Sequence, residues 1–322
     1  MLVKMSRILI TGGAGFIGSH LCERLLRRGN QVFCIDDLND SYSPDIKRKN
    51  LGRCMQNKNF MFYKEDILNK RKMEEIIKKE EIEKIVHLAA RAGVRPSIKQ
   101  PLLYSEVNVR GTLNLLEITK DSGVEHFIFG SSSSVYGINS RIPFSEDDRL
   151  DKPISPYAVS KIAGELFCFN YSHLYGIPIT CLRFFTVYGP RQRPEMAIHK
   201  FTRLIDNGRE IPMYGDGTTK RDYTYITDII DGIISSLEKR FKFEIFNLGS
   251  SKPVELRYLI SLIEKSLGKK ADIKRLPERP GDVPITCADI SKSRKILNYD
   301  PKVSIEEGIR RFTEWFRSGG EN

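Results

Sequence analysis

The sequence has no long apolar run and no closely spaced pair of cysteines. A helix that crosses a bilayer needs about 20 consecutive apolar residues, and no segment approaches that length, so we expect no membrane partner. The six cysteines never form a CxxC pair, which argues against a zinc site or a redox dithiol. We therefore predict no metal, and we interpret the scattered cysteines as typical of a reducing cytosol.

An export signal and a basic block are also lacking. The first residues, MLVKMSRILITGG, lead directly into an apolar strand and a glycine turn, without an apolar h-region or a small-residue cleavage site. We therefore expect a cytoplasmic protein. The net charge is +11, but the lysines are mixed with acids, as in KKEEIEK, which favours a solvated surface over nucleic-acid binding. A polyanionic substrate is the alternative explanation for part of the excess charge.

The first half of the chain alternates apolar strands with helical patterns. Strands are expected at 7–11, 31–37, 60–67, 84–90 and 126–132, and helices at 19–29, 72–81 and 108–123. A helix at 157–175 and a strand at 179–185 continue the pattern. This alternation predicts an α/β fold with a doubly wound parallel sheet covered on both faces. Loops rich in Pro, Gly and Arg follow residue 185 and predict a second, smaller domain.

Residues 11–18, TGGAGFIG, place Gly12, Gly15 and Gly18 between a strand and a helix. Glycines allow a tight turn and a close approach to a pyrophosphate, which the helix N-terminus attracts. Asp36 ends the next strand, where it can accept hydrogen bonds from an adenosine ribose and repel a 2′-phosphate, so NAD is favoured over NADP. A glycine turn without a ligand is the alternative. Further cofactor contacts are expected at strand ends and in the first helix: Phe16, Ile17, Asn39, Asp66, Ile67, Leu88, Ala89 and Ala90. Asp66 is alternatively a helix N-cap.

Tyr157 and Lys161 form a YxxxK pair at the start of a helix. Residues four apart share a helix face. A nearby ammonium stabilises a phenolate and lowers the tyrosine pKa from about 10. The pair therefore predicts a tyrosine that acts as a base near neutral pH.

TGGAGFIG, Asp36, YxxxK and SSSSVYG together resemble the extended short-chain dehydrogenase/reductase family over nearly the whole chain. The resemblance implies a Rossmann-type NAD-binding domain at 1–185 with a return segment at about 226–250. A smaller C-terminal α/β substrate domain would comprise 186–225 and 251–322. It further implies tightly held NAD and a homodimer. Three catalytic roles follow from it: Tyr157 is the base, Lys161 binds the nicotinamide ribose, and Ser132, or alternatively Ser133, contacts the reacting hydroxyl. Asn108 and Phe185 would also contact the cofactor.

The serine run at 131–134 contains no acid. In this family, sugar-nucleotide dehydratases carry an Asp-Glu pair before VYG, and nucleotide-sugar decarboxylases carry a Glu there. A site without that acid can remove and return a hydride and move one hydroxyl proton, which is what a 4-epimerase needs. The resemblance therefore implies 4-epimerisation of a UDP-sugar through a transient 4-keto sugar. A serine-rich loop without bearing on the reaction type is the alternative.

Two segments resemble those of UDP-glucuronate 4-epimerases, RFFTVYGPRQRPEMA at 183–197 and AARAGVRPSIKQP at 89–101. This resemblance places Thr186 and Arg193 at the sugar carboxylate. Other substrate contacts would be Val94, Arg95, Ser132, Ser133, Ala197, Lys200, Tyr214, Arg221, Arg279 and Asp282. Arg191-Gln192 departs from the Trp-Gly of those enzymes, so UDP-glucose and UDP-N-acetylglucosamine remain alternative substrates. A decarboxylase or a 4-ketoreductase is less favoured.

Overall fold

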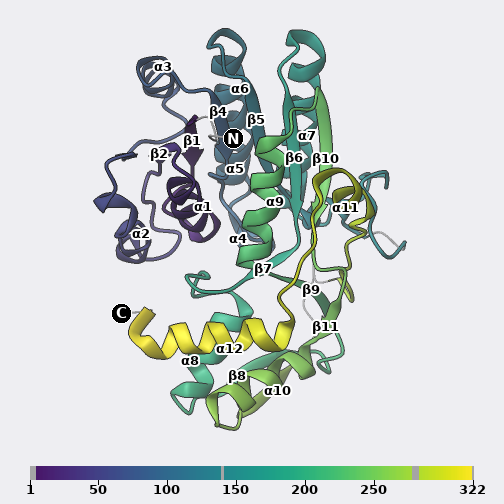
Figure 1. Cartoon of the computed structure of the whole chain (residues 1–322). Helices are drawn as coiled ribbons and strands as arrows, with labels where there is room; N and C mark the ends of the chain where they lie inside the picture. The colour runs from purple at the N-terminus through teal and green to yellow at the C-terminus, as the bar shows by residue number, and fades with distance from the viewer. Residues whose placement is uncertain (1–4, 139–140, 278–282, 321–322) are drawn as a thin grey trace.

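The computed structural model describes residues 5–138, 141–277 and 283–320. Its main feature is a parallel sheet of seven strands in the order β10-β6-β5-β4-β1-β2-β3 (Figure 1). Their bounds are β1 (Arg7–Thr11), β2 (Gln31–Ile35), β3 (Phe60–Tyr63), β4 (Lys84–His87), β5 (His126–Ser132), β6 (Ile179–Phe184) and β10 (Phe243–Leu248). The order reverses direction at β1, as in a doubly wound sheet. The predicted fold class is confirmed.

Helices cover both faces of this sheet (Figure 1). One face packs against α1 (Phe16–Arg27) and α9 (Ile226–Glu238), and the other against α3 (Lys70–Lys79), α6 (Gly111–Asp121) and α7 (Pro156–Tyr175). Shorter helices lie in the connections: α2 (Pro44–Leu51), α4 (Val94–Lys99) and α5 (Pro101–Tyr104). Because both faces of the sheet are buried, its strands are nearly continuous apolar runs.

Some element bounds differ from those expected. The third strand ends at Tyr63 rather than at 67, since Asp66 accepts a hydrogen bond from the backbone N–H of Leu68 at 2.9 Å and closes a turn there. The helix expected at 108–123 begins with a wider turn over Ser105–Arg110, and regular α-helix starts at Gly111. Asn108 lies in that wider turn.

The remaining elements lie below the main sheet in Figure 1, except α11 (Ser291–Leu297), which contacts β10 at the edge of that sheet. A three-stranded sheet contains β11 (Pro253–Glu255), β9 (Lys220–Tyr225) and β7 (Thr186–Tyr188), and a two-stranded sheet contains β12 (Ile273–Leu276) and β8 (Ile211–Tyr214). The remaining helices are α8 (Ala197–Asp206), α10 (Leu256–Leu267), α11 (Ser291–Leu297) and α12 (Ile305–Trp315). Both α9 and β10 fall within the predicted return segment. The division into two domains stays a proposal, because a single apolar core runs from α1 and α9 into α8, α10 and α12.

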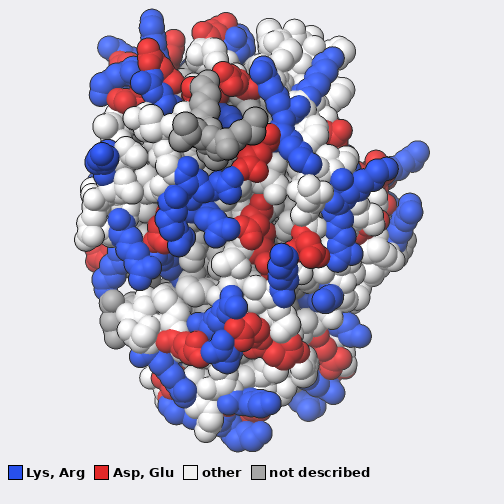
Figure 2. Space-filling view, viewed as in Figure 1, with Lys and Arg blue, Asp and Glu red and all other residues white. Residues whose placement is uncertain are grey.

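The surface carries both signs of charge in close mixture on the face shown in Figure 2. Across the described part of the chain, no helix combines the length and apolarity needed to cross a membrane. All six cysteines are buried free thiols. Within the same residues, His, Cys, Asp and Glu side chains do not gather into a group that could hold a metal ion.

Buried histidines are held in their neutral form beside the main sheet. Thr112 donates to the Asn108 carbonyl, so its hydroxyl oxygen accepts from Nε2 of His87 at 3.0 Å, and Nδ1 accepts from Thr11 at 2.7 Å. Burial, followed by the charge of Lys161, lowers the pKa of His87 to about 3. His126 lies against the Thr180 hydroxyl at 3.0 Å. Burial lowers its pKa to about 4.

These pKa shifts predict acid-sensitive stability. His126 has a pKa of about 4 when folded against 6.5 for the exposed ring, so the unfolded chain takes up the proton first as the pH falls. Stability is then lost with falling pH, by up to about 1.4 kcal/mol per pH unit for each such group. We expect His126→Gln to show a shallower fall of the unfolding free energy between about pH 6 and 5, measured in urea. Parallel pH profiles for the two proteins would contradict the assignment.

Candidate active site

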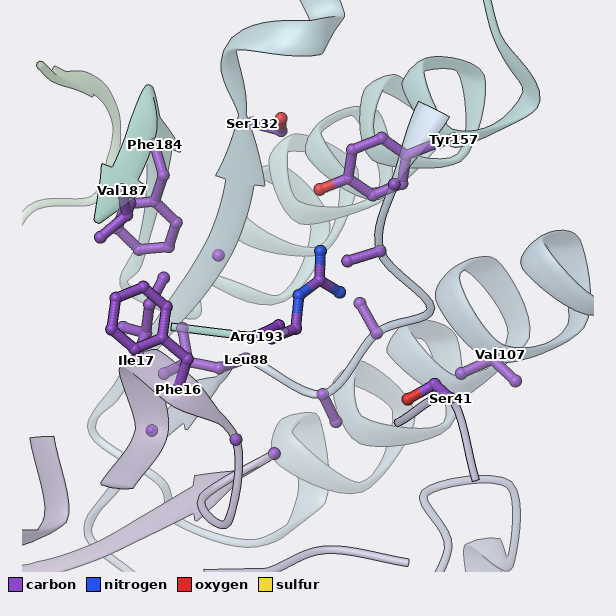
Figure 3. A pocket seen from close by; sticks show the side chains of 18 of the residues that line it. Phe16, Ile17, Ser41, Leu88, Val107, Ser132, Tyr157, Phe184, Val187 and Arg193 are labelled. Atoms are coloured by element: carbon purple, nitrogen blue, oxygen red, sulfur yellow. The ribbon is translucent and has the colours of Figure 1, made fainter. Parts of the chain in front are cut away.

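A cavity of about 380 Å³ lies at the carboxyl ends of the main-sheet strands. It is lined from the turns after β1, β2, β3, β4, β5 and β6, from the start of α7 and from the loop that follows β7. In open α/β sheets, ligands bind at this edge, where the strand order reverses. Figure 3 shows Ser132, Tyr157 and Arg193 pointing into the cavity from three different segments.

The β1–α1 turn forms the floor of the cavity. Gly12 has a left-handed φ of +70°, and a Cβ on it would lie 2.7 Å from the backbone N of Ala89. A Cβ on Gly18 would lie 2.2 Å from the Gly12 carbonyl oxygen. Gly15 is the N-cap of α1 and provides no side-chain cap, so backbone N–H groups of the first turn remain open to an anion. The glycines therefore serve close packing and leave room for a pyrophosphate.

Asp36 is fixed beside this turn at the end of β2. Its carboxylate accepts hydrogen bonds from the backbone N–H groups of Ala14 at 3.1 Å and Leu38 at 2.9 Å. Burial raises its pKa, while those two N–H groups and the charge of Lys47 act in the opposite direction. Lys47 is itself held by the carbonyl and side-chain oxygens of Asn39, at 2.8 and 3.0 Å. The role predicted for Asp36, accepting hydrogen bonds from an adenosine ribose, stays a prediction.

Tyr157 and Lys161 enter the cavity from the first turns of α7. The helix starts there because the Ser155 side chain accepts from the backbone N–H of Ala158 at 3.1 Å and Pro156 occupies the first turn. Burial raises the pKa of Tyr157, whereas a hydrogen bond with Ser132 and the charge of Arg193 lower it. Lys161 Nζ donates to the Gly130 carbonyl at 2.6 Å, and burial lowers its pKa to about 8.

The predicted lowering of the Tyr157 pKa by Lys161 is therefore not found in this structure. The groups that favour the phenolate are Ser132 and Arg193, and burial outweighs them. The Lys161 ammonium donates to the carbonyl of Gly130, on β5. Of the two serines considered, Ser132 is the one whose side chain lowers the pKa of Tyr157, and its hydroxyl donates to Ser134 at 3.1 Å.

All four serines of the run line the cavity. Ser131 also donates to Glu165 at 2.5 Å. Glu165 also accepts two hydrogen bonds from Arg183, at 2.9 and 2.8 Å, and both side chains are buried. Ser132 points into the cavity, and Ser133 and Ser134 begin the short 3-10 turn Ser133–Tyr136. No carboxylate lines the cavity beside these serines within the described residues.

Most predicted cofactor residues line the cavity. They are Gly12, Gly15, Phe16, Ile17, Gly18, Asp36, Asn39, Asp66, Ile67, Leu88, Ala89, Ala90, Tyr157, Lys161 and Phe185. Asn108 does not. Its amide instead holds both backbone groups of Arg91 and the Ser160 hydroxyl, at 2.7 to 2.9 Å. Asn108 therefore supports the loop after β4 rather than facing the cavity.

The predicted substrate residues are distributed more widely. Val94, Ser132, Ser133, Thr186 and Arg193 line the cavity. Arg95 lies over the ring of Tyr214, 5.5 Å from its centroid, which joins α4 to β8 outside the cavity lining. Ala197 and Lys200 lie on α8, and Arg221 on β9. Arg279 and Asp282 lie outside the described residues.

Several lining residues were not predicted from the sequence, among them Tyr42, Lys47, Glu65 and Met196. Tyr42 is the most informative. Its hydroxyl is buried, has no hydrogen-bond partner among the described residues, and lies 4.0 Å from the position of a Cβ on Gly15. Burial raises the pKa of Tyr42, so the hydroxyl remains a donor beside the open N-terminus of α1. Tyr42 lies in a loop and belongs to no periodic pattern, so its position after Asp36 was the one sequence signal for a residue of the cofactor site.

Such a cavity, with its pyrophosphate turn, ribose acid and tyrosine–lysine pair, defines an NAD-dependent enzyme of the short-chain dehydrogenase/reductase class. Comparison with known proteins extends this result. The family profile described as GDP-mannose 4,6 dehydratase matches residues 9–312. A UDP-glucuronate 4-epimerase of Thermodesulfobacterium geofontis is 45% identical over 318 residues, which is 98% of each chain.

Two solved structures are also close. The UDP-glucuronic acid 4-epimerase of Bacillus cereus, in complex with UDP-glucuronic acid and NAD, is 39% identical with a TM-score of 0.92, over 97% of this chain and 99% of that one. A UDP-N-acetylglucosamine 4-epimerase of Methanobrevibacter ruminantium is 34% identical with a TM-score of 0.90, over 98% of this chain and 99% of that one. The chain belongs to the extended short-chain dehydrogenase/reductase family of NAD-dependent sugar-nucleotide epimerases. The predicted enzyme class, an NAD-dependent UDP-sugar 4-epimerase, and the predicted cofactor, NAD, are confirmed.

The buried Tyr42 hydroxyl predicts an effect on NAD retention. We expect Tyr42→Phe to bind NAD about tenfold more weakly, because a hydrogen bond to a charged group contributes about 1.5–3 kcal/mol. Calorimetric titration of NAD into stripped protein measures this without an activity assay. Tyr63→Phe is the matched control, since that hydroxyl donates to Glu80 at 2.7 Å outside the cavity. Equal affinity of wild type and Tyr42→Phe would refute the expected contact.

Proposed function

We propose that this enzyme interconverts UDP-glucuronate and UDP-galacturonate. The observation that carries the proposal is the position of Thr186 and Arg193 in the same cavity as Ser132 and Tyr157. Thr186 opens β7, directly after the main-sheet strand β6, and Arg193 lies in the loop beyond β7. A hydroxyl donor and a guanidinium suit a sugar carboxylate.

The reacting groups can perform the proton transfer of a 4-epimerase. Tyr157 takes the proton of the sugar 4-hydroxyl and later returns it, while the Ser132 hydroxyl, hydrogen-bonded to Tyr157, holds the same oxygen. Bound NAD supplies the capacity to accept the hydride from carbon 4 and give it back. Return of the hydride to the opposite face of the 4-keto sugar inverts the configuration at carbon 4. To take the proton, Tyr157 has to be a phenolate, a form that Ser132 and the charge of Arg193 favour against the effect of burial, which raises its pKa.

A uronate imposes one more requirement on the site. Oxidation at carbon 4 produces a β-keto acid, which readily loses carbon dioxide. The enzyme therefore needs to hold the carboxylate in an unproductive orientation by charged and hydroxyl donors. In this structure Arg193 Nε pairs with the half-exposed Glu195 at 3.1 Å. Because that pair is partly exposed and weak, Arg193 can exchange it for a substrate carboxylate.

A neutral hexose is the second candidate substrate. It is favoured by the similarity to the UDP-N-acetylglucosamine 4-epimerase of Methanobrevibacter ruminantium. The two candidates differ in charge at carbon 6, so they make opposite demands on Arg193.

We propose a cytoplasmic location, in keeping with six cysteines that are all free thiols.

Proton NMR of the sugar signals tests the proposal. The purified enzyme, incubated with UDP-glucuronate without added NAD, is expected to form a mixture with UDP-galacturonate. UDP-glucose and UDP-N-acetylglucosamine serve as parallel substrates. Turnover of only the neutral sugars would transfer the proposal to the second candidate, and formation of a UDP-pentose as main product would show that the acid-free serine run does not prevent decarboxylation.

The same assay separates the roles of the two carboxylate contacts. We expect Thr186→Val and Arg193→Ala to raise the ratio of UDP-pentose to epimer severalfold, because the carboxylate loses a donor. Thr186→Ser and Arg193→Lys are matched controls that keep the hydroxyl and the charge, and they should remain closer to wild type. An unchanged product ratio in both truncated variants would count against contact with the carboxylate.

We further propose a homodimer through α7. Val159, Leu166 and Phe169 are more than half exposed and follow helical spacing along one stripe of α7. Ile98 on α4 and Leu102 on α5, two helices that pack on α7, add further exposed apolar area. A second copy offers the same apolar stripe, and a two-fold axis would pair the two α7 helices.

Light scattering after gel filtration tests the dimer. We expect Leu166→Glu to weaken association, so that the molar mass falls toward that of one chain on dilution, because a carboxylate would be buried in the interface. Met55→Glu is the matched control, since Met55 is equally exposed but lies far along the chain from α7. A wild-type protein that is monomeric at all concentrations would refute the proposal.

A further inference from the structure

The 189–196 loop, between β7 and α8, has two faces. Arg193 and Met196 line the cavity. Arg191, two residues before Arg193, is not part of the lining and points to α1 instead. Its φ is +65°, a left-handed conformation that is uncommon outside glycine, so the chain turns sharply at this residue. Arg191, the first of the two residues that depart from the Trp-Gly of UDP-glucuronate 4-epimerases, is therefore located on the outer face of the loop.

Two contacts join this outer face to α1. Arg191 Nη2 lies 2.5 Å from Glu23 Oε1, and the two side chains are only 15% and 13% exposed. His20 Nε2 lies 2.9 Å from the Pro190 carbonyl oxygen, which can only accept, so Nε2 carries the proton. Burial, followed by the charge of Arg191, lowers the pKa of His20 to about 4. The ring is thus neutral near pH 7 and donates one fixed hydrogen bond.

The inner side of the loop is fixed by Gln192. Its side-chain nitrogen donates to the Val187 carbonyl at 3.1 Å, and its side-chain oxygen accepts from the backbone N–H of His199 at 3.2 Å. The Gln192 carbonyl also lies 2.5 Å from Nδ1 of the His199 ring. Arg191 and Gln192 therefore anchor the loop to α1 on one side and to β7 and α8 on the other.

Helix α1, which contacts the 189–196 loop, also forms part of the cofactor cavity. Phe16, in the first turn of α1, lines the cavity and packs edge-on against the His20 ring, with centroids 5.9 Å apart. His20 and Glu23 follow at helical spacing on the same side of α1. A continuous set of contacts therefore runs from Phe16 through His20 and Pro190 to the segment that carries Arg193.

We propose that Glu23 and Arg191, with His20, act as a latch that positions Arg193 against the substrate. These three are positioning residues, since none of them lines the part of the cavity that holds the reacting groups. Loss of Glu23 removes the carboxylate that pairs with the Arg191 cation in a mostly buried position. Arg27, the other cation near Glu23, at 4.0 Å, cannot replace that carboxylate. The loop is then free to leave the position seen here. The proposal rests on the proposed function only in placing Arg193 at the UDP-sugar.

Steady-state kinetics with a double-mutant cycle test the latch. We expect Glu23→Gln to raise KM for the UDP-sugar about five- to tenfold, which corresponds to about 1–1.4 kcal/mol, with a smaller change in kcat and with NAD affinity unchanged. Arg191→Gln should have a similar effect. The double variant should be no worse than the poorer single variant, because the two residues act as one pair.

A matched control lies on the same helix. Arg24 pairs with Asp231 of α9 at 2.6 Å, but these side chains are 40% and 55% exposed, so Arg24→Gln should leave KM unchanged. An unchanged KM in Glu23→Gln, additive effects of Glu23→Gln and Arg191→Gln, or an equal effect of Arg24→Gln would each overturn the latch. The assay uses whichever UDP-sugar the enzyme epimerises, so failure with UDP-glucuronate alone bears on the proposed function and not on the latch.

Discussion

The buried ion pair between Glu165 and Arg183 joins the three elements on which the reacting groups depend. Glu165 lies on α7, one turn beyond Lys161, and Arg183 lies on β6, just before Thr186. Ser131 adds β5 through its hydrogen bond to Glu165. Removing one partner of such a pair typically costs about 3–5 kcal/mol, because the other charge stays buried. The pair thus keeps the tyrosine, the serine and the start of β7 in one fixed relation without itself touching a ligand.

The cavity has opposite chemical character at its two ends. Carboxylates gather at the dinucleotide end, where Asp36, Glu65 and Asp66 follow β2 and β3. The end formed by β5, α7 and the 189–196 loop carries hydroxyls and Arg193 instead. A pKa of about 8 leaves Lys161 mostly protonated near pH 7, so Lys161 and Arg193 are two cations at this end of the cavity. Their charges favour anionic groups beside the hydroxyls.

The sequence predicted the strand–helix alternation, the glycine turn, Asp36 and the Tyr157–Lys161 pair because each of these depends on local spacing. Their cavity positions followed from one rule, that parallel strands end at one edge. Tyr42 and the Glu23–Arg191 pair were not predictable, since they depend on how distant loops and helices meet. The same limit applies to Asn108, whose identity matched but whose amide supports the loop after β4. From the sequence alone, Arg191 could be interpreted as a change in sugar recognition. In the structure its side chain pairs with Glu23 on α1 instead.

Strand β10 lies at the edge of the main sheet and is the last strand of that sheet to be synthesised. The strands from β1 to β6 are synthesised in chain order, but β6 pairs with its last neighbour, residues 243–248, only after the chain has passed through the smaller sheets. Until then the residues ITCLRF of β6 have unpaired backbone groups along one edge, which can act as a template for pairing between nascent chains. Asn247 of β10 also completes the hydrogen bond to Tyr136 beside Arg183. The growing polypeptide is thus vulnerable to aggregation during translation until the segment that protects this edge has emerged.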